Sequence, residues 1–388
     1  MTRKRLDPSV LRVDPRIAEG YYTDEYFNRT RDVLRKAGHH PIVRWQVFQK
    51  QKATVCGIDE AIGIMKVAMG DDFRKLDVFA LHDGDRIDPF ETVMLVEGDL
   101  VLFSHLETVV LGALARRTRV ATNVYRTVRA ACYATPKPVL FFPARFDIYQ
   151  AQAGDGYAYD VAVQRIVAES QGGVSTQAQG AWWGSRAIGT IPHQLEAAYA
   201  GDLVTATLVF AEHTDPDVKR VALVDYHNDC VRSTLEVADA MLGRFLETDH
   251  DERYRLFAVR LDTSGTLVDQ SVIPEMELFP PTGVNPTLVR KVHDALKSRA
   301  ASHPEGSVER DYYDHIGIIV SGGFTPEKIL EFERQKLPVT AYGVGSSMFA
   351  GQYDFTADVV GLKINGEWRH EAKVGRRYRP NPRLERVE

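Results

Sequence analysis

Beyond about Val139, the hydrophobic residues of the chain fall into short continuous runs that alternate with longer amphipathic segments. Each run is rich in β-branched residues and ends in a polar or glycine-containing turn. Continuous apolar runs of this length are typical of the buried strands of a parallel sheet. The pattern therefore predicts strands at residues 139–144, 187–192, 205–210, 221–225, 256–262, 316–323 and 339–346.

Segments with helical spacing lie between these runs, at residues 160–170, 229–245, 286–300 and 326–335. Strands that alternate with helices predict βαβ units, and about seven consecutive units fit a (β/α) barrel better than a single open sheet. A doubly wound sheet is the alternative that the same pattern permits. In either case we expect an α/β fold.

The first 118 residues follow a different pattern, in which short strands at 42–48 and 91–98 are mixed with helical segments at 23–37, 60–69 and 106–116. This mixture predicts an N-terminal α+β domain at 1–118, ahead of a barrel domain at 119–349. We expect residues 350–388 to join the N-terminal domain. Their basic end is either a solvated tail or a strand packed on that domain, and both are favoured over a role in nucleic-acid binding.

Composition narrows the class of protein. The chain has 388 residues, enough for two domains, and 44% of them are hydrophobic, which excludes a mainly disordered chain. Lys plus Arg is 48 and Asp plus Glu is 53, giving a net charge of -5, so the basic footprint of nucleic-acid or membrane binders is missing.

The cysteines and the apolar stretches indicate in which cellular compartment the protein is expected. The three cysteines are far apart and form no CxxC pair, which argues against a disulfide framework or a cysteine zinc site. The N-terminal residues lack the apolar core of a secretory signal, and no apolar stretch approaches the ~20 residues that span a bilayer. We therefore expect a cytoplasmic protein with no membrane or nucleic-acid partner.

Polar residues and glycines follow most of the predicted strands. In a (β/α) barrel the active site lies at the carboxyl ends of the strands, so these residues are expected to converge on one face. Any one of them has an ordinary structural explanation as a turn residue. In chain order they are Arg145, Thr190, His193, Asp225, Arg260, Asp262, Ser321, Gly322, Gly323, Gly343, Gly345 and Ser346.

Two glycine-rich strand ends favour a phosphorylated ligand. The motif SGGFTPEK places Gly322 and Gly323 ahead of a helix that Thr325 caps and Pro326 opens, and YGVGSS supplies a second loop at the next strand. Glycines let backbone N–H groups approach an oxyanion, and a helix N-terminus adds a favourable dipole. Loops after the last two strands of a barrel often form such a site.

The charged strand ends predict a sugar and an anion nearby. Asp225 and Asp262 are placed to bind ribose hydroxyls or a Mg²⁺ ion carried by a diphosphate, although each could simply begin a turn. Arg260 is two residues before Asp262, so the two side chains lie on the same side of the strand. The planar guanidinium of Arg260 is suited to bind a carboxylate or a phosphate. A lone histidine such as His193 is more often structural than catalytic. The histidines of the chain show no HxH or HExxH spacing, so we expect no zinc site.

The ordered motifs of the chain resemble the nicotinate phosphoribosyltransferase family, particularly its shorter archaeal-type branch. The resemblance covers nearly the whole chain and rests on YYTDEYF, EGDLVLFSHLETVVLGALARRTRVATN, GVSTQAQ, GTIPH, LVD, RLDTSG, SGGF and YGVGSS. It implies an irregular (β/α) barrel of the type II phosphoribosyltransferase kind. It also implies the first step of NAD salvage from nicotinate: condensation of nicotinate with phosphoribosyl diphosphate to nicotinate mononucleotide and diphosphate, with Mg²⁺ as cofactor and ATP as co-substrate.

The resemblance also implies roles for single residues. His193, in GTIPH, matches the histidine that carries a phosphoryl group, and Tyr26 matches a tyrosine that stacks on the pyridine ring. That tyrosine is commonly delivered from the partner subunit, so we expect a homodimer or higher homo-oligomer with shared active sites. Thr190 and Arg260 match positions that hold nicotinate, and Ser346 stands where the family's GVGT threonine contacts the phosphoribosyl phosphate. We assign Asp225 and Asp262 to the ribose and its Mg²⁺.

The chain departs from the family pattern in places that bear on its substrate. No cysteine follows Cys230, so the zinc knuckle of some archaeal-type members is missing, and PARFD around Arg145 does not match the long bacterial form. Ile191 follows Thr190 where nicotinamide enzymes have an aspartate, which favours nicotinate. Nicotinamide or quinolinate phosphoribosyltransferase, or a non-catalytic phosphate-ligand sensor, are the alternatives.

Overall fold

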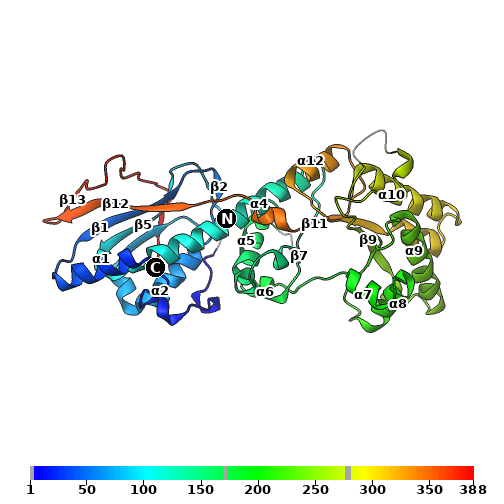
Figure 1. Ribbon diagram of the computed structural model, residues 1–388, viewed down its shortest axis with the longest axis horizontal. Helices are drawn as coiled ribbons and strands as arrows, with labels where there is room; N and C mark the ends of the chain where they lie inside the picture. The colour runs from blue at the N-terminus through cyan, green and yellow to red at the C-terminus, as the bar shows by residue number, and fades with distance from the viewer. Residues whose placement is uncertain (1–3, 169–172, 276–280) are drawn as a thin grey trace.

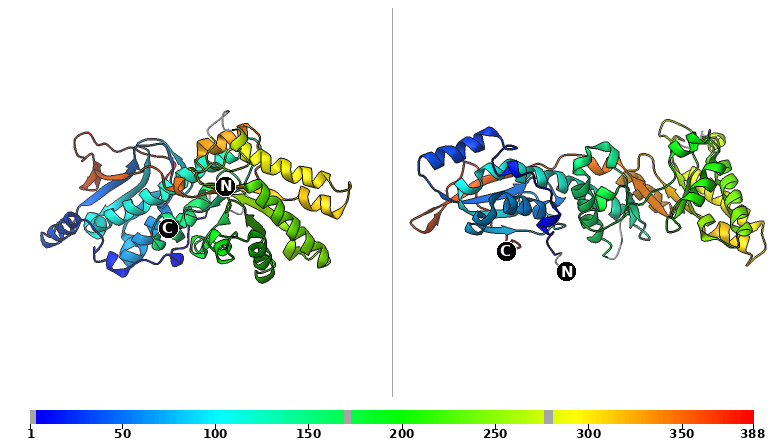
Figure 2. Two further views of the ribbon diagram at one scale, coloured as in Figure 1. Left: turned by 45° about the vertical axis from the view of Figure 1, so that its right-hand side comes forward. Right: turned by 90° about the horizontal axis from the view of Figure 1, so that it is seen from below.

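The computed structural model describes residues 4–168, 173–275 and 281–388, which form two lobes in an elongated arrangement (Figures 1 and 2). One lobe contains an antiparallel sheet and the other a parallel sheet. Helix α4 (Glu107–Ala131) is long enough to take part in both lobes, with Leu114 in one hydrophobic core and Val124 in the other. The fold is therefore two cores connected by a shared helix.

The N-terminal lobe is built on a six-stranded sheet in the order β13-β12-β1-β5-β3-β14. All of its strand pairs are antiparallel, and β1 lies between β12 and β5 over nearly its whole length. A separate two-stranded antiparallel sheet is formed by β2 and β4. The bounds are β1 (Ile42–Gln49), β2 (Ala53–Thr54), β3 (Asp77–Ala80), β4 (Arg86–Ile87), β5 (Thr92–Asp99), β12 (Phe355–Ile364), β13 (Glu367–Arg369) and β14 (Glu385–Arg386).

The end of the chain returns to this sheet. Strand β12 pairs along β1, and Arg386 of β14 pairs with Phe79 of β3. Of the two expectations for the basic end, a packed strand is what the structure has at residues 385–386. The helices of this lobe are α1 (Glu25–Lys36), α2 (Ile58–Met69) and the short α3 (Leu100–Phe103), with single 3-10 turns at Pro8–Val10, Pro15–Ile17, η3 (Gly70–Lys75) and η4 (Ser104–Leu106).

The second lobe is built on a six-stranded parallel sheet in the order β7-β6-β11-β10-β9-β8, curled into a half barrel. Its inner face carries one buried apolar side chain from each of five strands, which form a small cluster: Leu140, Val221, Ala258, Ile319 and Ala341. Alternate residues point to the outer face and into the main core, as strand geometry requires. The strands are β6 (Val139–Phe141), β7 (Gly173–Val174), β8 (Arg220–Leu223), β9 (Leu256–Leu261), β10 (Gly317–Val320) and β11 (Ala341–Val344).

Helices surround the parallel sheet, and the longer ones, α9 and α10, lie at the far end of the molecule from α1 (Figure 1). The predicted alternation of strands and helices is confirmed for most of this lobe. The helices are α5 (Gln152–Gln164), α6 (Gln177–Gly180), α7 (His193–Ala198), α8 (Leu203–His213), α9 (Cys230–Glu247), α10 (Pro286–Ala301), α11 (Val308–Asp314) and α12 (Pro326–Arg334), with 3-10 turns η5 (Ala144–Phe146), Tyr149–Ala151, Glu252–Tyr254, Ile273–Glu275 and η9 (Ser346–Phe349).

Two predicted strands are wrong. Residues 205–210 lie inside helix α8, where the side chain of Asp202 caps the helix by accepting from Thr205 N. A six-residue apolar run does not by itself distinguish a buried strand from a buried helix, and the cap decides here. Residues 187–192 form only one bridge, between Ala187 and Val174, because Pro192 has no N–H to donate to a ladder.

Two predicted helices also differ from the structure in extent. Helix α5 begins at Gln152, eight residues before the predicted start at residue 160, and residues 169 and 170 of that prediction lie outside the described residues. The predicted helix at 106–116 continues to Ala131 as α4, through the proposed domain boundary at residue 118. The boundaries at 118 and 350 therefore remain predictions about domains, since one helix serves both cores.

A buried ion-pair network fixes α4 to its neighbours. The Arg117 guanidinium is 7% exposed and contacts Glu60 of α2 at 2.6 Å and Asp155 of α5 at 2.7 Å. Arg116 contacts the same Asp155 at 2.7 Å. Because α2 belongs to one lobe and α5 to the other, this network joins them rigidly at the shared helix. Removing one partner would leave an uncompensated buried charge, which is strongly destabilising.

A pair of buried carboxyl groups lies at the same junction. Asp59 and Asp83 are 4% and 5% exposed, and the Tyr157 hydroxyl of α5 lies 3.3 Å and 3.1 Å from their oxygens. Asp59 also accepts from Arg5 at 2.8 Å, and Asp83 accepts from Ile58 N at 2.8 Å. Burial, reinforced by the charge of Asp59, raises the pKa of Asp83 to about 8. The burial and the neighbouring charge of Asp59 therefore favour the protonated form of Asp83.

We expect Asp83→Asn to stabilise the protein at pH 9. The folded-state pKa of Asp83, about 8, lies above its ordinary value of 3.8, so its contribution to the free energy of unfolding is complete below about pH 4 and is lost as pH rises toward 8. Asparagine keeps an acceptor for Ile58 N and cannot ionise. The free energy of unfolding of the variant and of the wild type is compared from pH 6 to pH 9 by thermal unfolding. Relative to the wild type, the variant's free energy of unfolding should rise by about 2 kcal/mol or more toward pH 9.

Asp88→Asn is the control for this prediction, because the Asp88 side chain is 74% exposed and pairs with Lys52 at 3.4 Å. Its stability difference from the wild type should not vary with pH over this range. If Asp83→Asn and Asp88→Asn both show pH-independent differences, Asp83 does not hold a proton in the folded protein.

Candidate functional site

The carboxyl edge of the parallel sheet brings together most of the residues that the sequence predicts for a site. They reach this edge from the segment before α7, from the ends of β8 and β9, and from the loops after β10 and β11. Because parallel strands all end at the same edge, residues far apart in the sequence become neighbours there. The residues drawn together by direct contacts are Thr190, His193, Asp225, Arg260, Asp262, Ser321 and Gly322.

Arg260 is held at this edge by neighbours on two sides. Its Nη1 donates to Thr190 Oγ1 at 2.6 Å, and its Nη2 lies 3.7 Å from Asp262 Oδ2. The Arg260 side chain is 14% exposed, and its Nε has no hydrogen-bond partner among the described residues. A mostly buried guanidinium with an unused donor is suited to bind an anion through its planar fork.

His193 and Asp225 form a second contact. His193 Nε2 lies 3.1 Å from Asp225 Oδ1, with the histidine side chain 45% exposed and the aspartate 9% exposed. Burial raises the pKa of Asp225; the contact with His193 lowers it, and the nearby charge of Asp262 raises it further. His193 is the first residue of α7, so a helix begins where the sequence indicates one, although the strand expected before it is not formed. Its imidazole is thus exposed on one side and oriented by a carboxylate on the other.

The loop after β10 packs against the end of β9. Ser321 Oγ donates to Asp262 Oδ1 at 2.7 Å, so the serine orients this carboxylate. Gly322 has φ +82°, and a Cβ there would lie 3.3 Å from the Asp262 carbonyl oxygen. A side chain is therefore disfavoured at Gly322 by conformation and by space. The adjacent Gly323 is exposed and also has a positive φ, which leaves its backbone accessible from solvent.

The loop after β11 continues the edge toward β6. A Cβ at Gly343 would lie 2.8 Å from the Phe142 ring, and one at Gly345 would lie 2.7 Å from the Phe146 ring. Ser346 is exposed at the start of η9, and Arg145 is exposed in η5, with its guanidinium 5.5 Å from the Phe146 ring centroid. The two loops are adjacent, but no hydrogen bond links Arg145 or Ser346 to the other candidates within the described ranges.

Tyr26 is the candidate that the structure does not bring to this edge. It lies on α1, in the lobe opposite the parallel sheet (Figure 1), and is 60% exposed with its ring 4.3 Å from that of Phe27. Asp24, before α1, contacts Thr108 of α4 at 2.9 Å, which fixes the start of the helix. Within one chain, Tyr26 therefore cannot contact a ligand held at the edge.

The chain is similar to known proteins in the sequence of its N-terminal part and in its overall fold. A sequence model described as the N-terminal domain of quinolinate phosphoribosyl transferase matches residues 24–118. The crystal structure of nicotinate-nucleotide pyrophosphorylase from Pyrococcus furiosus is 29% identical and superposes with a TM-score of 0.72, over 94% of this chain and 80% of that chain. The chain is therefore similar to type II phosphoribosyltransferases and shares their fold.

More distant structures share this type II phosphoribosyltransferase fold. The human nicotinic acid phosphoribosyltransferase is 16% identical with a TM-score of 0.63, over 89% of this chain and 75% of that chain. Nicotinate-nucleotide pyrophosphorylase from Francisella tularensis is 11% identical with a TM-score of 0.54, over 90% and 98% of the two chains. No curated protein sequence matches the chain significantly. The predicted fold, an irregular barrel with an N-terminal α+β domain, is confirmed.

Glu196 is a site residue that sequence reasoning missed. It lies one turn after His193 on α7, is 1% exposed, and its Oε2 has no partner among the described residues. Burial raises the pKa of Glu196 to about 7; the charge of Asp225 raises it, and that of Arg260 lowers it. The spacing of three residues from His193 was the only available signal, because it places both side chains on one face of a helix.

The carboxylates at this edge suit a metal that arrives with a phosphorylated ligand. Among the described residues, no group of three or more His, Cys, Asp or Glu side chains is arranged to hold a metal ion. Asp225 and Asp262 are close enough for one charge to raise the pKa of the other. Two carboxylates, with phosphate oxygens and water, match the ligands of Mg²⁺ in phosphate-binding sites.

In the described part of the chain, no helix is long and apolar enough to span a membrane.

Proposed function

We propose that the protein is a nicotinate phosphoribosyltransferase, which joins nicotinate to phosphoribosyl diphosphate and releases diphosphate. The observation that carries this proposal is the partly unsatisfied Arg260 guanidinium, held by Thr190 and Asp262 beside the glycine loops. A single buried cation suits the single carboxylate of nicotinate. Ile191, next to Thr190, is buried and offers no side-chain acceptor for an amide.

The sugar and its phosphate are assigned to the loops beside Arg260. Backbone N–H groups of Gly322, Gly323 and Gly345 line the loops after β10 and β11, and Ser346 adds an exposed hydroxyl. Such loops hold a phosphate and so fix the ribose for attack by the pyridine nitrogen. Ser321 and Gly343 are buried at the base of these loops, and the exposed Arg145 of η5 is a further candidate for the phosphate.

The carboxylates stabilise the reaction centre in this proposal. As the bond from the anomeric carbon to diphosphate breaks, positive charge develops on the ribose, and the Asp262 carboxylate oriented by Ser321 can stabilise it. Asp225 and Asp262 would also hold Mg²⁺, which supplies neutralising charge to the leaving diphosphate. The new bond forms between the pyridine nitrogen and the anomeric carbon, so no enzyme nucleophile on the sugar is needed.

ATP is proposed to act through His193. Since a carboxylate can only accept, the 3.1 Å contact means that Nε2 donates to Asp225, which leaves the imidazole lone pair on Nδ1. Attack of this nitrogen on the γ-phosphorus of ATP forms the N–P bond and releases ADP, and water later cleaves that bond. Tyr26 cannot reach the sheet edge of its own chain. In this proposal it stacks on the pyridine ring held at the sheet edge of a second copy of the chain. A homodimer or higher homo-oligomer is therefore part of it.

Quinolinate phosphoribosyltransferase is the second candidate, because the matching family model and the name of the Pyrococcus furiosus enzyme favour that branch. Quinolinate has two carboxylates, and its reaction also releases CO₂. At the proposed pyridine site, Thr190 and Asp262 hold one cation, Arg260. One cation at the pyridine site favours one carboxylate, so nicotinate is preferred.

A comparison of substrates tests the proposal directly. Diphosphate release is measured with nicotinate, nicotinamide and quinolinate, each with phosphoribosyl diphosphate and Mg²⁺, with and without ATP. We expect kcat/KM for nicotinate to exceed the other two by at least about 100-fold, since one lost charge-assisted contact amounts to about 2–3 kcal/mol. Faster turnover of quinolinate with CO₂ release would replace the proposal with the second candidate, and no turnover would favour a ligand-binding protein.

A further inference from the structure

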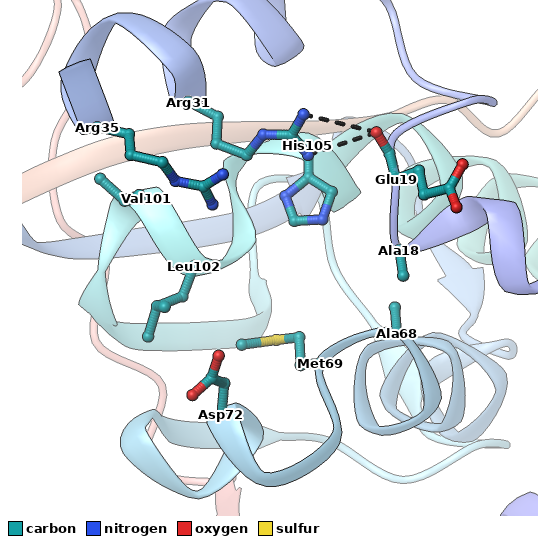
Figure 3. A pocket seen from close by; sticks show the side chains of 10 residues that line it. All are labelled: Ala18, Glu19, Arg31, Arg35, Ala68, Met69, Asp72, Val101, Leu102 and His105. Atoms are coloured by element: carbon teal, nitrogen blue, oxygen red, sulfur yellow. Dashed lines mark hydrogen bonds between the residues drawn. The ribbon is translucent and has the colours of Figure 1, made fainter.

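A cavity in the N-terminal lobe lies far from the parallel sheet edge and combines charged and apolar walls. Its volume is about 420 Å³, within the range of small-molecule sites. It lies between α1, the start of α3 and η4, and the end of α2 with η3. The apolar part of its wall consists of Ala18, Ala68, Met69, Val101 and Leu102, and the polar part of Glu19, Arg31, Arg35, Asp72 and His105 (Figure 3).

Two arginines one helical turn apart enter this cavity from α1. Arg31 is mostly buried, and its guanidinium makes only long contacts of 3.5 Å to the Glu19 carbonyl oxygen and 3.3 Å to Asp32. Arg35 has no hydrogen bond or ion pair with any described residue. Figure 3 shows both guanidinium groups on the same side of the cavity. Arg35 is exposed to solvent on one side. The two cations repel each other across the cavity, and an anion bound between them would relieve this repulsion.

His105 supplies the second, independent observation. Its side chain is 6% exposed, its ring points into the cavity in Figure 3, and its Nδ1 has no partner among the described residues. Burial first, and then the charges of Arg31 and Arg35, lower the pKa of His105 to about 4, although a hydrogen bond with the Ala18 backbone raises it. A buried ring nitrogen without a partner requires a polar ligand.

The charges on the opposite wall do not cancel the arginines. Asp72 contacts Lys75 at 2.6 Å, so its charge is already offset. The carboxylate of Glu19 points away from Arg31 in Figure 3, and only its backbone carbonyl faces the arginine. The net field at the level of His105 is therefore positive, which favours an anion.

We propose that this cavity binds a small phosphate monoester that carries an apolar group. Three terminal oxygens match the three groups Arg31, Arg35 and His105, and the apolar wall receives the organic part. A phosphate monoester has a second pKa near 6, so it can accept a hydrogen bond from Nδ1 or donate one to it, whereas a carboxylate can only accept. This inference is independent of the reaction proposed for the sheet edge.

Binding at this cavity would tie α1 to the rest of its lobe. None of the residues of α1, all of which the structure describes, is buried, so the helix is held mainly by surface contacts with α3 and η4. An anion held by two α1 arginines and by His105 of η4 adds a link between these elements. Backbone hydrogen exchange in α1 should therefore slow when the ligand binds.

The test uses phenyl phosphate as the probe and hydrogen exchange of residues 29–36, the part of α1 that carries Arg31 and Arg35, as the readout. Tyr26 of the same helix is proposed to reach a ligand at the sheet edge of a second copy, so the arginine variants, which leave that edge unchanged, distinguish binding at the cavity from binding there. In the wild type, millimolar phenyl phosphate should slow this exchange, and inorganic phosphate should do so more weakly because it lacks the apolar group. In the variant Arg31→Gln/Arg35→Gln, the concentration needed should rise about 10- to 100-fold or more.

Arg29→Gln is the matched control, since Arg29 lies on the same helix, is 76% exposed and pairs with Glu25 at 3.6 Å. Arg29→Gln removes one positive charge, as each cavity substitution does, and it should leave the slowing of exchange by phenyl phosphate unchanged. The single variant Arg35→Gln, which breaks no contact among the described residues, serves if the double variant does not fold. An equal response in the arginine variants, no response in the wild type, or a response to benzoate but not to phenyl phosphate would each overturn the proposal.

Discussion

Replacing Arg260 by methionine is expected to lower kcat/KM for nicotinate about 100- to 1000-fold, because it removes one partner of a mostly buried charge pair. The Arg260 guanidinium is 14% exposed and held by Thr190 at 2.6 Å, so its position is set before a ligand arrives. Much of the loss should appear in KM, since the carboxylate is bound in the ground state and in the transition state alike. Steady-state diphosphate release measures both parameters.

Arg260→Lys should recover only part of the loss, because an ammonium group is a point charge without the planar fork. Arg232→Lys is the control: this arginine of α9 is 57% exposed and pairs within its own helix region with Asp229 and Glu236. Any residual turnover of nicotinamide, which has no carboxylate, should change far less than that of nicotinate. Equal losses for the two substrates would mean that Arg260 only maintains the structure of the edge.

The parts of the fold that the sequence predicts are those in which local pattern and burial agree. The strands β9, β10 and β11 each lie inside a predicted β-branched run, β8 begins one residue before its run, and β1 and β5 coincide closely with theirs. The run at 205–210 is equally apolar but forms a helix, because capping by Asp202 and the burial of Ala206 and Ala211 on one face decide its conformation. Local composition alone cannot supply that decision.

The candidate site shows the same division between local and distant information. The sheet topology follows from the βαβ pattern, so the meeting of the strand ends could be predicted from the sequence. The pairing of Arg260 with Thr190, across 70 residues, could not, because it depends on how the segment before α7 crosses the edge. Glu196 could not be predicted either. It lies on a six-residue helix, and a single sequence does not show that its side chain is 1% exposed.

Replacing His193 by alanine is expected to abolish the stimulation by ATP while a slow, ATP-independent synthesis of nicotinate mononucleotide remains. His193 is the proposed phosphoryl carrier, whereas the carboxylates and the glycine loops that position the sugar do not depend on its side chain. ATP hydrolysis, measured as ADP release, should fall to the level without enzyme. Incubation of the wild type with γ-labelled ATP should leave a label on the protein that acid removes and alkali does not.

The same substitution should also shift the pH dependence of the slow reaction. In the wild type the contact with His193 lowers the pKa of Asp225, in opposition to burial and to the charge of Asp262. Without His193 the folded-state pKa of Asp225 rises, so activity that needs this carboxylate ionised should be lost at a higher pH as the solution is acidified. His213→Ala, at the exposed end of α8, is the control and should change neither property. If His193→Ala still hydrolyses ATP at the wild-type rate, the phosphoryl group is carried by another residue.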